Sequence, residues 1–194
     1  MGFLSVISCA HRLAASRIRP GDAAVDATVG TGADTAFLCR AVGAGGIVYG
    51  FDIQQEALDR AAQRLAREPG LDASRVRFFL RSHAELWEAV PEERRGRISA
   101  IMFNLGYLPG GDQEIITRPE STIPALEAAI ALLRPGGIVT AVLYPGHPGG
   151  REEAEAVERW ASLLPESQFQ TIMYRFLNRS GNPPYVIAVE KKSE

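Results

Sequence analysis

The chain has 194 residues, 46% hydrophobic and 23% charged, which excludes a disordered protein and is enough for one domain with a sizeable core. Its formal net charge of −2 excludes bulk attraction to nucleic acid, so RNA binding would require a local basic patch. Two cysteines exclude a disulfide framework, and no apolar run reaches the roughly 20 residues that span a bilayer. Residues 1–15 also lack the pattern of a signal peptide, so we expect a soluble, cytoplasmic protein.

The chain begins with a predicted helix over residues 5–18, where apolar residues recur at helical spacing. A helix in this position can cover a ligand pocket, and Pro20-Gly21 ends it before a first strand at 23–25. A glycine turn at 30–32 then leads into a helix over 36–42. The elements that follow are strands at 47–53, 76–80, 98–103 and 138–144, and helices at 55–68, 85–90, 121–133 (capped by Ser121) and 152–164 (with Leu163 and Leu164 facing inward).

Two further strands, at 169–176 and 185–189, close the chain and are joined only by residues 177–184. Because parallel neighbours need a long crossover, this short link predicts an antiparallel C-terminal hairpin at the sheet edge. Strands that alternate with helices predict a mostly parallel sheet with helices on both faces. No repeat or linker interrupts the chain, so we predict one seven-stranded, Rossmann-like α/β domain over 1–194, with the N-terminal helix within 1–20 covering the pocket.

The first strand, the glycine turn and the next helix form the usual place for a nucleotide-like ligand. A dinucleotide fingerprint needs a third glycine where this chain has Thr35, and Asp34 at the helix start would repel a pyrophosphate. The same carboxylate suits a ligand with an ammonium group, and Asp26 adds a second one. This pattern favours S-adenosylmethionine over NAD, although a capped helix with a structural turn gives a similar pattern. The candidate donor-binding residues here are Asp26, Gly30, Thr31, Gly32, Asp34 and Thr35.

The next two strands end in residues that could hold the nucleoside part of such a donor. Asp52 stands where an acid hydrogen-bonds both ribose hydroxyls, and Gln54 either lines the adenosine pocket or merely begins the next helix. Ser82 and His83 follow the third strand, where an adenine edge would lie. His83 could instead pack against the next helix.

The fourth strand ends in a glycine-rich loop over residues 104–112, where Rossmann-like methyltransferases place the acceptor nitrogen. Amide-nitrogen methyltransferases carry D/N-P-P-Y/F there, and Asn104-Leu105-Gly106-Tyr107 can supply the same oxygen, carbonyls and aromatic ring. We therefore predict Asn104 and Tyr107 as catalytic residues. A literal Asn-Pro-Pro-Tyr at 182–185 precedes the last strand and is read as a rigid hairpin connection that could also lie near the substrate.

Other residues in these loops are candidates for substrate contact. His147, after the fifth strand, could orient the substrate or remove a proton, or it could stabilise a turn. The candidate substrate-binding residues are Gly106, Asp112, His147 and Asn182, and the candidate phosphate contacts are Arg118, Arg151, Arg175 and Arg179. Nothing in the cysteine and histidine spacing predicts a metal site.

Several motifs together resemble one family over nearly the whole chain. They are Asp-Ala-Thr-x-Gly-x-Gly-x-Asp-Thr at 26–35, Gly-Phe-Asp-Ile-Gln at 50–54, Ser-His at 82–83, Phe-Asn-Leu-Gly-Tyr-Leu-Pro-Gly-Gly-Asp at 103–112, Gly-His-Pro at 146–148 and Asn-Pro-Pro at 182–184. The chain resembles the bacterial family long labelled putative rRNA methylase, whose members are understood as tRNA 5-(aminomethyl)-2-thiouridine methyltransferases. Three positions depart from its pattern: Thr31 replaces an asparagine, Ala33 a histidine and Gln113 a common lysine.

The resemblance implies a class I methyltransferase fold, S-adenosylmethionine as donor, tRNA as partner and a methylaminomethyl wobble uridine as product. By residue match it assigns donor binding to Asp34, Asp52, Gln54, Ser82, His83 and the turn at 30–32. The alternatives are an rRNA base or a small-molecule amine as acceptor, a nicotinamide-dependent oxidoreductase, and a ligand-binding protein without catalysis. A homodimer would combine two weak basic patches.

Overall fold

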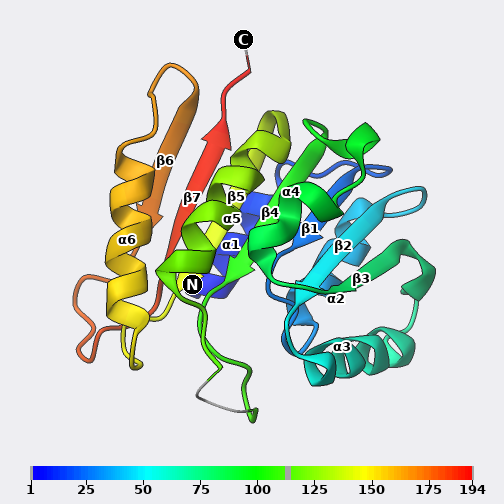
Figure 1. Ribbon diagram of the computed structural model, residues 1–194, viewed down its shortest axis with the longest axis horizontal. Coiled ribbons are helices and arrows are strands. Elements are labelled where there is room, and N and C mark those ends of the chain that lie inside the picture. The colour runs from blue at the N-terminus through cyan, green and yellow to red at the C-terminus, as the bar shows by residue number, and fades with distance from the viewer. Residues whose placement is uncertain (1, 112–114, 194) are drawn as a thin grey trace.

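The computed structural model describes residues 2–111 and 115–193 and has one seven-stranded sheet at its centre (Figure 1). The strand order is β3-β2-β1-β4-β5-β7-β6, and only β7 runs antiparallel to its neighbours. This confirms the predicted sheet and its C-terminal hairpin. The strands are β1 (Ala23–Asp26), β2 (Ile47–Asp52), β3 (Val76–Leu80), β4 (Ile98–Asn104), β5 (Leu133–Leu143), β6 (Phe169–Tyr174) and β7 (Tyr185–Lys191).

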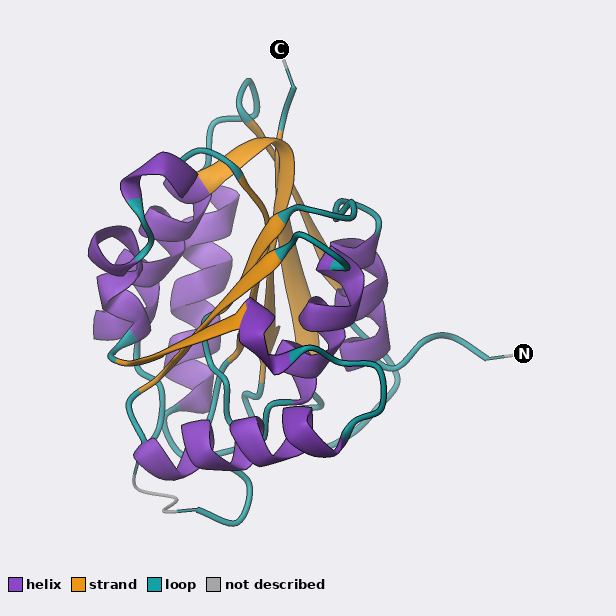
Figure 2. Cartoon of the chain, turned by 90° about the vertical axis from the view of Figure 1, so that its right-hand side faces the viewer, coloured by secondary structure: helices purple, strands orange, loops and turns teal. Residues whose placement is uncertain are grey.

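Figure 2 shows the sheet between two layers of helices. One layer contains α1 (Val6–Ala15), which packs on β4, β5 and β7, and α2 (Ala33–Val42) and α3 (Gln55–Arg67), which pack on β1 to β3. The other layer contains α4 (Leu86–Ala89), α5 (Pro119–Leu132) and α6 (Gly150–Ser162). Short 3-10 helices occupy Ala73–Arg75, His83–Glu85 and Glu92–Arg94. None of the helices within the described ranges is long and apolar enough to cross a membrane.

The central strands are apolar on both faces because both faces are covered by helices. Along β1, Ala24 packs with the α1–α2 layer and Val25 with the α4–α6 layer. Along β4, Met102 packs with the α1–α2 layer and Phe103 with the α4–α6 layer, and both are almost fully buried. This continuous apolar core fixes the positions at which the strands end, and therefore the positions of the loops that follow them.

Three local predictions are wrong. β5 begins at Leu133 rather than Ile138, because a bulge shifts its register against β4 and Gly136 (φ +72°) accommodates the shift. α5 begins at Pro119, a favourable first helical residue, so Ser121 is not its cap. Because α6 ends at Ser162, Leu163 lies beyond the helix with 76% of its surface exposed.

The central position of β1 creates the crevice in which a ligand can bind. The chain continues from β1 to β2 on one side, and β4 lies on the other side of β1. The loops that follow β1 and β4 therefore diverge at the carboxyl edge of the sheet, which is where open α/β sheets bind their ligands. In Figure 1 the connection after β4 extends below this edge.

Candidate active site

A cavity of about 670 Å³ lies at the carboxyl edge of the sheet and is lined by loops that follow β1 to β5. Its volume is in the range of small-molecule sites. Twelve of the predicted site residues line it together: Gly30, Thr31, Asp34, Asp52, Gln54, Ser82, His83, Asn104, Gly106, Tyr107, His147 and Asn182. Asp112 lies outside the described residues.

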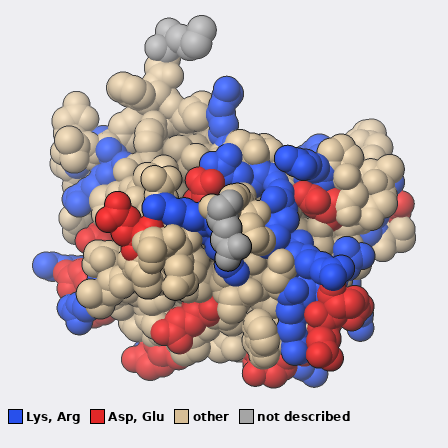
Figure 3. Space-filling view, turned by 90° about the horizontal axis from the view of Figure 1, so that it is seen from above, with Lys and Arg blue, Asp and Glu red and all other residues tan. Residues whose placement is uncertain are grey.

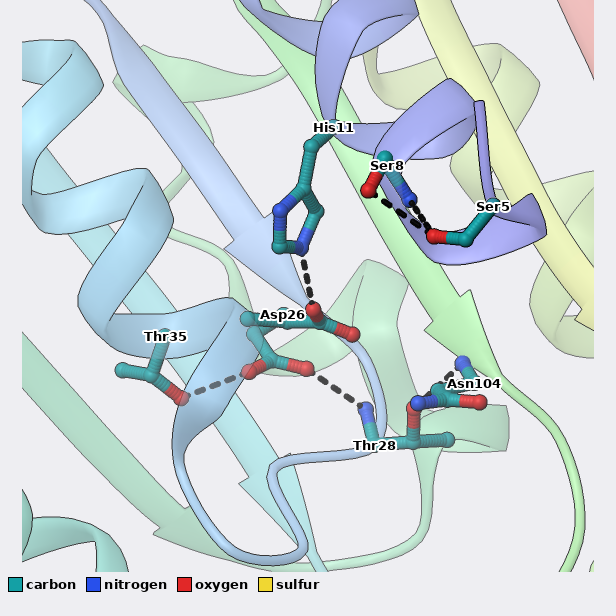
Figure 4. A network of polar contacts seen from close by, with 8 residues as sticks. Ser5, Ser8, His11, Asp26, Thr28, Thr35 and Asn104 are labelled. Carbon is teal, nitrogen blue, oxygen red and sulfur yellow. Dashed lines mark hydrogen bonds and ion pairs between the residues drawn. The ribbon is translucent and has the colours of Figure 1, made fainter. Parts of the chain in front are cut away.

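Asp26 and Thr35, unlike Asp34 and Asp52, are not among the residues that line the cavity. Both are completely buried, and the Thr35 hydroxyl donates a 2.6 Å hydrogen bond to Oδ2 of Asp26 while the Thr28 amide donates to Oδ1 (Figure 4). Burial, together with the nearby Asp34, raises the pKa of Asp26 to about 7. Because these side chains bond to one another, their role is to brace the glycine turn.

The two glycines of the turn do different things. At Gly30 (φ +52°) an added Cβ would collide with nothing, since its nearest neighbour would be Leu108 Cδ1 at an ordinary contact distance of 3.8 Å, but the positive φ favours glycine. Its backbone can therefore approach a ligand closely. Gly32 (φ +76°) does not line the cavity, because it packs on α3, where an added Cβ would lie 2.6 Å from the Ala61 Cα. Gly32 thus fixes the helix against its neighbour.

Asp34 enters the cavity from the start of α2 and is held by a residue of α1. The His11 Nε2 lies 2.6 Å from Asp34 Oδ1, and the His11 ring stacks in parallel on Phe37 with centroids 4.0 Å apart. Figure 4 shows His11 pointing from α1 toward the turn. The stack fixes the plane of the imidazole, so one Asp34 oxygen is occupied and the carboxylate is oriented for a cationic ligand.

Asp52, at the end of β2, presents a carboxylate whose geometry is fixed by the backbone. Its Oδ2 accepts a 2.9 Å hydrogen bond from the Gly30 amide, and its Oδ1 accepts one of the same length from the Gln54 amide. Burial raises the pKa of Asp52, and these hydrogen bonds act in the opposite direction. Each carboxylate oxygen keeps a further acceptor position, which suits a pair of vicinal hydroxyls.

His83 forms part of the apolar side of the cavity, beside the edge of the Phe103 ring. Its Nε2 lies 3.2 Å from the Ser121 hydroxyl, which in turn donates to the Arg118 carbonyl. Burial lowers the pKa of His83 from 6.5 to about 4. The imidazole is therefore neutral near pH 7 and can serve as a wall or a hydrogen-bonding group, but not as a cation.

Asn104 ends β4 facing the glycine turn, and a backbone hydrogen bond fixes its position. Its amide donates a 2.7 Å hydrogen bond to the Thr28 hydroxyl (Figure 4). Burial raises the pKa of the Tyr144 hydroxyl, and the nearby Asn104 side chain acts in the opposite direction. The Asn104 backbone is thus anchored to the loop after β1, and the residue lines the cavity.

The loop after Asn104 is closed on itself and tied to α6. The Thr117 amide donates to the Gly106 carbonyl at 2.9 Å, and Tyr107 pairs with Ile116 in an isolated antiparallel bridge. The buried Glu153 accepts hydrogen bonds from the Thr117 and Thr122 hydroxyls at 2.7 and 2.6 Å. These contacts hold Tyr107, 42% exposed, at the mouth of the cavity.

His147 lies against this loop with its ring edge toward Tyr107, at a centroid distance of 5.7 Å. Its Nδ1 is 2.9 Å from the Pro148 carbonyl, and a carbonyl only accepts, so this nitrogen carries the hydrogen. In the neutral ring Nε2 is then the proton acceptor. Nε2 is buried without a hydrogen-bond partner among the described residues, beside Gly106. His147 therefore offers a free acceptor next to the Asn104 loop.

The sequence matches the family model described as "Putative rRNA methylase" over residues 48–190. The chain belongs to this rRNA methylase family. It is 40% identical over 190 residues to the chloroplastic tRNA (mnm5s2U34)-methyltransferase of Arabidopsis thaliana, covering 95% of this chain and 69% of that protein.

Solved structures agree with this membership of the rRNA methylase family. A putative rRNA-methylase from Clostridium thermocellum is 37% identical, with a TM-score of 0.92 over 98% of this chain and 100% of that chain. A putative methyltransferase from Streptococcus mutans, solved in complex with SAH, is 29% identical, with a TM-score of 0.86 over 98% of this chain and 99% of that chain. Both matches cover the sheet, both helical layers and the cavity edge.

In this member of the rRNA methylase family, the sequence patterns do not identify all the residues around the cavity. His11 is not among the candidate site residues, yet its ring contacts Asp34. None of Thr28, Ser121, Tyr144 and Glu153 is among the candidate site residues, because each acts through a partner that is distant in sequence. The one available signal is the location of Thr28 and Tyr144 at the carboxyl ends of strands.

His83 gives this rRNA methylase family member a measurable pH dependence of stability. Its folded pKa lies below the unfolded value, so its contribution is complete above pH 6.5 and is lost as pH falls through 6.5 toward 4. We expect the difference in unfolding free energy between wild type and His83→Gln to shrink by about 3 kcal/mol between pH 7 and pH 4. Urea denaturation of both proteins at several pH values measures this difference in unfolding free energy.

The comparison with the variant isolates His83 from a second group that titrates in the same range. The raised pKa of Asp26 changes stability in the opposite direction, but this contribution is common to both proteins and cancels in the difference. A difference that stays constant from pH 7 to 4 would show that His83 does not titrate as its burial requires.

Proposed function

We propose that this protein transfers a methyl group from S-adenosylmethionine to the exocyclic primary amine of 5-aminomethyl-(2-thio)uridine at the tRNA wobble position. The observation that supports it most is that one cavity joins a donor-type glycine turn and Asp52 to the anchored Asn104 loop. The choice of tRNA rests on the similarity to the Arabidopsis thaliana tRNA (mnm5s2U34)-methyltransferase over 95% of the chain.

The residues of the cavity fit this donor. We assign the ribose hydroxyls to Asp52, the ammonium end to the free oxygen of Asp34, and the close backbone approach to Gly30. Ser82, His83 and Phe51 provide the side of the cavity suited to an adenine ring. The nicotinamide alternative fits less well, because Thr35 fills the place of the third glycine and is bonded to Asp26.

When bound, S-adenosylmethionine supplies a methyl group that its sulfonium already activates, and loss of that group leaves S-adenosylhomocysteine. The chain's own contribution is therefore orientation of the amine and removal of its proton. Asn104 Oδ1 and the neighbouring carbonyls would accept hydrogen bonds from the amine, and Tyr107 would stack on the base. His147 Nε2 is the free acceptor suited to take the proton.

Further parts of this proposal concern the setting of the reaction. The whole chain, 1–194, would act as a single domain, with tRNA as its partner and the cytoplasm as its location. A homodimer would let two molecules share one tRNA, and light scattering of the protein with and without tRNA tests this. The rRNA and small-amine alternatives keep the same donor site and change only the acceptor.

The deciding experiment is mass spectrometry of wobble nucleosides after incubating the protein with donor and tRNA that lacks the terminal methyl. We expect 5-aminomethyl-2-thiouridine to gain one methyl group. Parallel reactions with rRNA and with free small amines test the alternative acceptors. Methylation of either of these without methylation of tRNA would overturn the proposed substrate, and donor binding without any transfer would indicate a binding protein.

A further inference from the structure

The connection between β6 and β7, residues 175–184, reaches the cavity and carries positive charge. Asn182 and Pro184 line the cavity, and the Asn182 carbonyl approaches Gly146 of the loop after β5. The segment contains two arginines and no Asp or Glu, although the whole chain has a net charge of −2. Residues 177–182 are all exposed. This segment is therefore a basic wall at one side of the cavity mouth.

The two arginines of this wall are held by aromatic rings rather than by carboxylates. The Arg179 guanidinium lies 3.9 Å over the Phe176 ring, which packs against the edge of Tyr174. The Arg175 guanidinium lies 5.7 Å from the Tyr185 ring centroid. In the ranges 2–111 and 115–193 neither arginine forms an ion pair. Both keep their charge and their N–H groups available to a ligand.

Several cations at the opposite edge of the sheet, in contrast, are paired with groups of the protein itself. Figure 3, seen from the edge at which the parallel strands begin, shows Lys and Arg gathered around the C-terminal end. Three cations that lie after α1, at the start of β5 and at the end of β7 have internal partners. Arg17 pairs with Glu190 at 2.8 Å, Arg134 with Asp22 at 3.6 Å, and Lys191 contacts the carbonyls of Ile130 and Leu133. They hold strand ends together, which leaves the wall at 175–184 better suited to an external anion.

We propose that residues 175–184 bind the RNA that flanks the target uridine. Arg175 and Arg179 contact phosphates, and the guanidinium of Arg179, backed by Phe176, forms a flat platform for a neighbouring unstacked base. RNA loops are recognised by such stacking on aromatic and guanidinium planes, and phosphates by arginine N–H groups. This inference rests on the proposed function, and it places the substrate strand along the wall, with the target base entering the cavity past Asn182.

The test compares two double variants that remove the same charge from opposite edges. Arg175→Ala/Arg179→Ala changes the wall, and Arg19→Ala/Arg97→Ala changes two exposed arginines that precede β1 and β4. Fluorescence anisotropy with a labelled anticodon stem-loop measures RNA affinity, and calorimetry measures donor affinity. We expect the wall variant to bind RNA about 10- to 100-fold more weakly, with unchanged donor affinity, and the control variant to bind RNA within about twofold of wild type.

Two further measurements separate the parts of the inference. The salt dependence of RNA binding should become shallower by about 0.7 in the log–log slope for each arginine–phosphate interaction that the wall variant removes. Arg179→Lys keeps the charge but removes the flat plane, so it should bind RNA more weakly while keeping the wild-type salt slope.

The outcomes distinguish this inference from the proposed function. Equal weakening by the wall and control variants, or no weakening by the wall variant, overturns the wall as the RNA-binding surface even if wild type methylates tRNA. A wild-type protein that binds no anticodon stem-loop overturns both. Wild-type affinity in Arg179→Lys overturns the stacking platform, because charge alone would then account for binding. Circular dichroism of each variant checks that the fold is intact.

Discussion

Replacing Asn104 by alanine is expected to lower turnover by about 10²- to 10³-fold and leave donor binding intact. Asn104 lines the cavity at the end of β4, and its backbone amide is bonded to the Thr28 hydroxyl, which fixes where the side chain starts. Without its oxygen, the amine loses the hydrogen bond that points its lone pair at the methyl carbon. Removal of such an orienting group lowers kcat by about 10²- to 10³-fold. Methylation of tRNA measures kcat, and calorimetry should find the affinity for S-adenosylmethionine within about twofold of wild type.

Asn182 offers a matched control, because it is a second asparagine in the cavity wall and belongs to the literal Asn-Pro-Pro-Tyr. Its φ of +51° favours glycine, so Asn182→Gly removes the side chain without backbone strain. We expect this variant to keep kcat within about threefold and to change mainly the KM for tRNA. Preserved turnover in Asn104→Ala together with abolished turnover in Asn182→Gly would move the orienting role to the hairpin connection.

The second large effect is on stability, and it concerns the glycine turn. Gly32→Ala places a Cβ 2.6 Å from the Ala61 Cα in a backbone conformation with φ +76°. The left-handed conformation costs about 1 kcal/mol and the collision with α3 about 2 kcal/mol more. We expect the free energy of unfolding to fall by about 3 kcal/mol, as measured by urea denaturation. The displaced turn should also weaken donor binding.

A substitution at Gly70 separates the cost of the left-handed backbone conformation from the cost of the collision with α3. It has nearly the same φ, +79°, but no atom lies within 4 Å of an added Cβ. Gly70→Ala should therefore cost only the conformational strain, about 1 kcal/mol. Equal destabilisation by the two substitutions would show that the packing of Gly32 on α3 contributes nothing, and that only the backbone conformation matters.

The alternation of strands and helices is sufficient to predict the sheet, because apolar periodicity and the short link at 177–184 determine strand direction. The carboxyl-edge location of the cavity follows from the same pattern, together with most of its lining. The predictions that are wrong concern local structure. The bulge at the start of β5 depends on how Leu133 and Ile138 pair with β4. The sequence alone does not show this pairing, so residues 134–137 look like a simple turn before the strand.

The limits of the site prediction have the same origin. A carboxylate in a motif can touch a ligand or support a residue that does. The motif does not show that Asp26 is fully buried and bonded to Thr35, whereas Asp34 lines the cavity. The contact of His11 with Asp34 joins residues that are 23 positions apart. Glu153 reads as one more charge on an amphipathic helix until the Thr117 and Thr122 hydroxyls are seen to face it. Such pairings depend on how the elements pack, and hydrophobic periodicity does not predict which side chains then meet.

The reversed direction of β7 has a consequence for how this edge of the sheet can change. If β7 were parallel to the other strands, a crossover helix would have to precede it. The connection from β6 would then reach β7 at the edge of the sheet opposite the cavity. An antiparallel strand instead adds one more loop to the edge that holds the cavity, outside every βα unit of the sheet. Residues 175–184 can therefore be shortened to a tight hairpin or grafted from a relative while the register of β5, β7 and β6 is kept. On the proposal that residues 175–184 bind RNA, exchanging this connection would change RNA recognition while the sheet and the donor side of the cavity stay as they are.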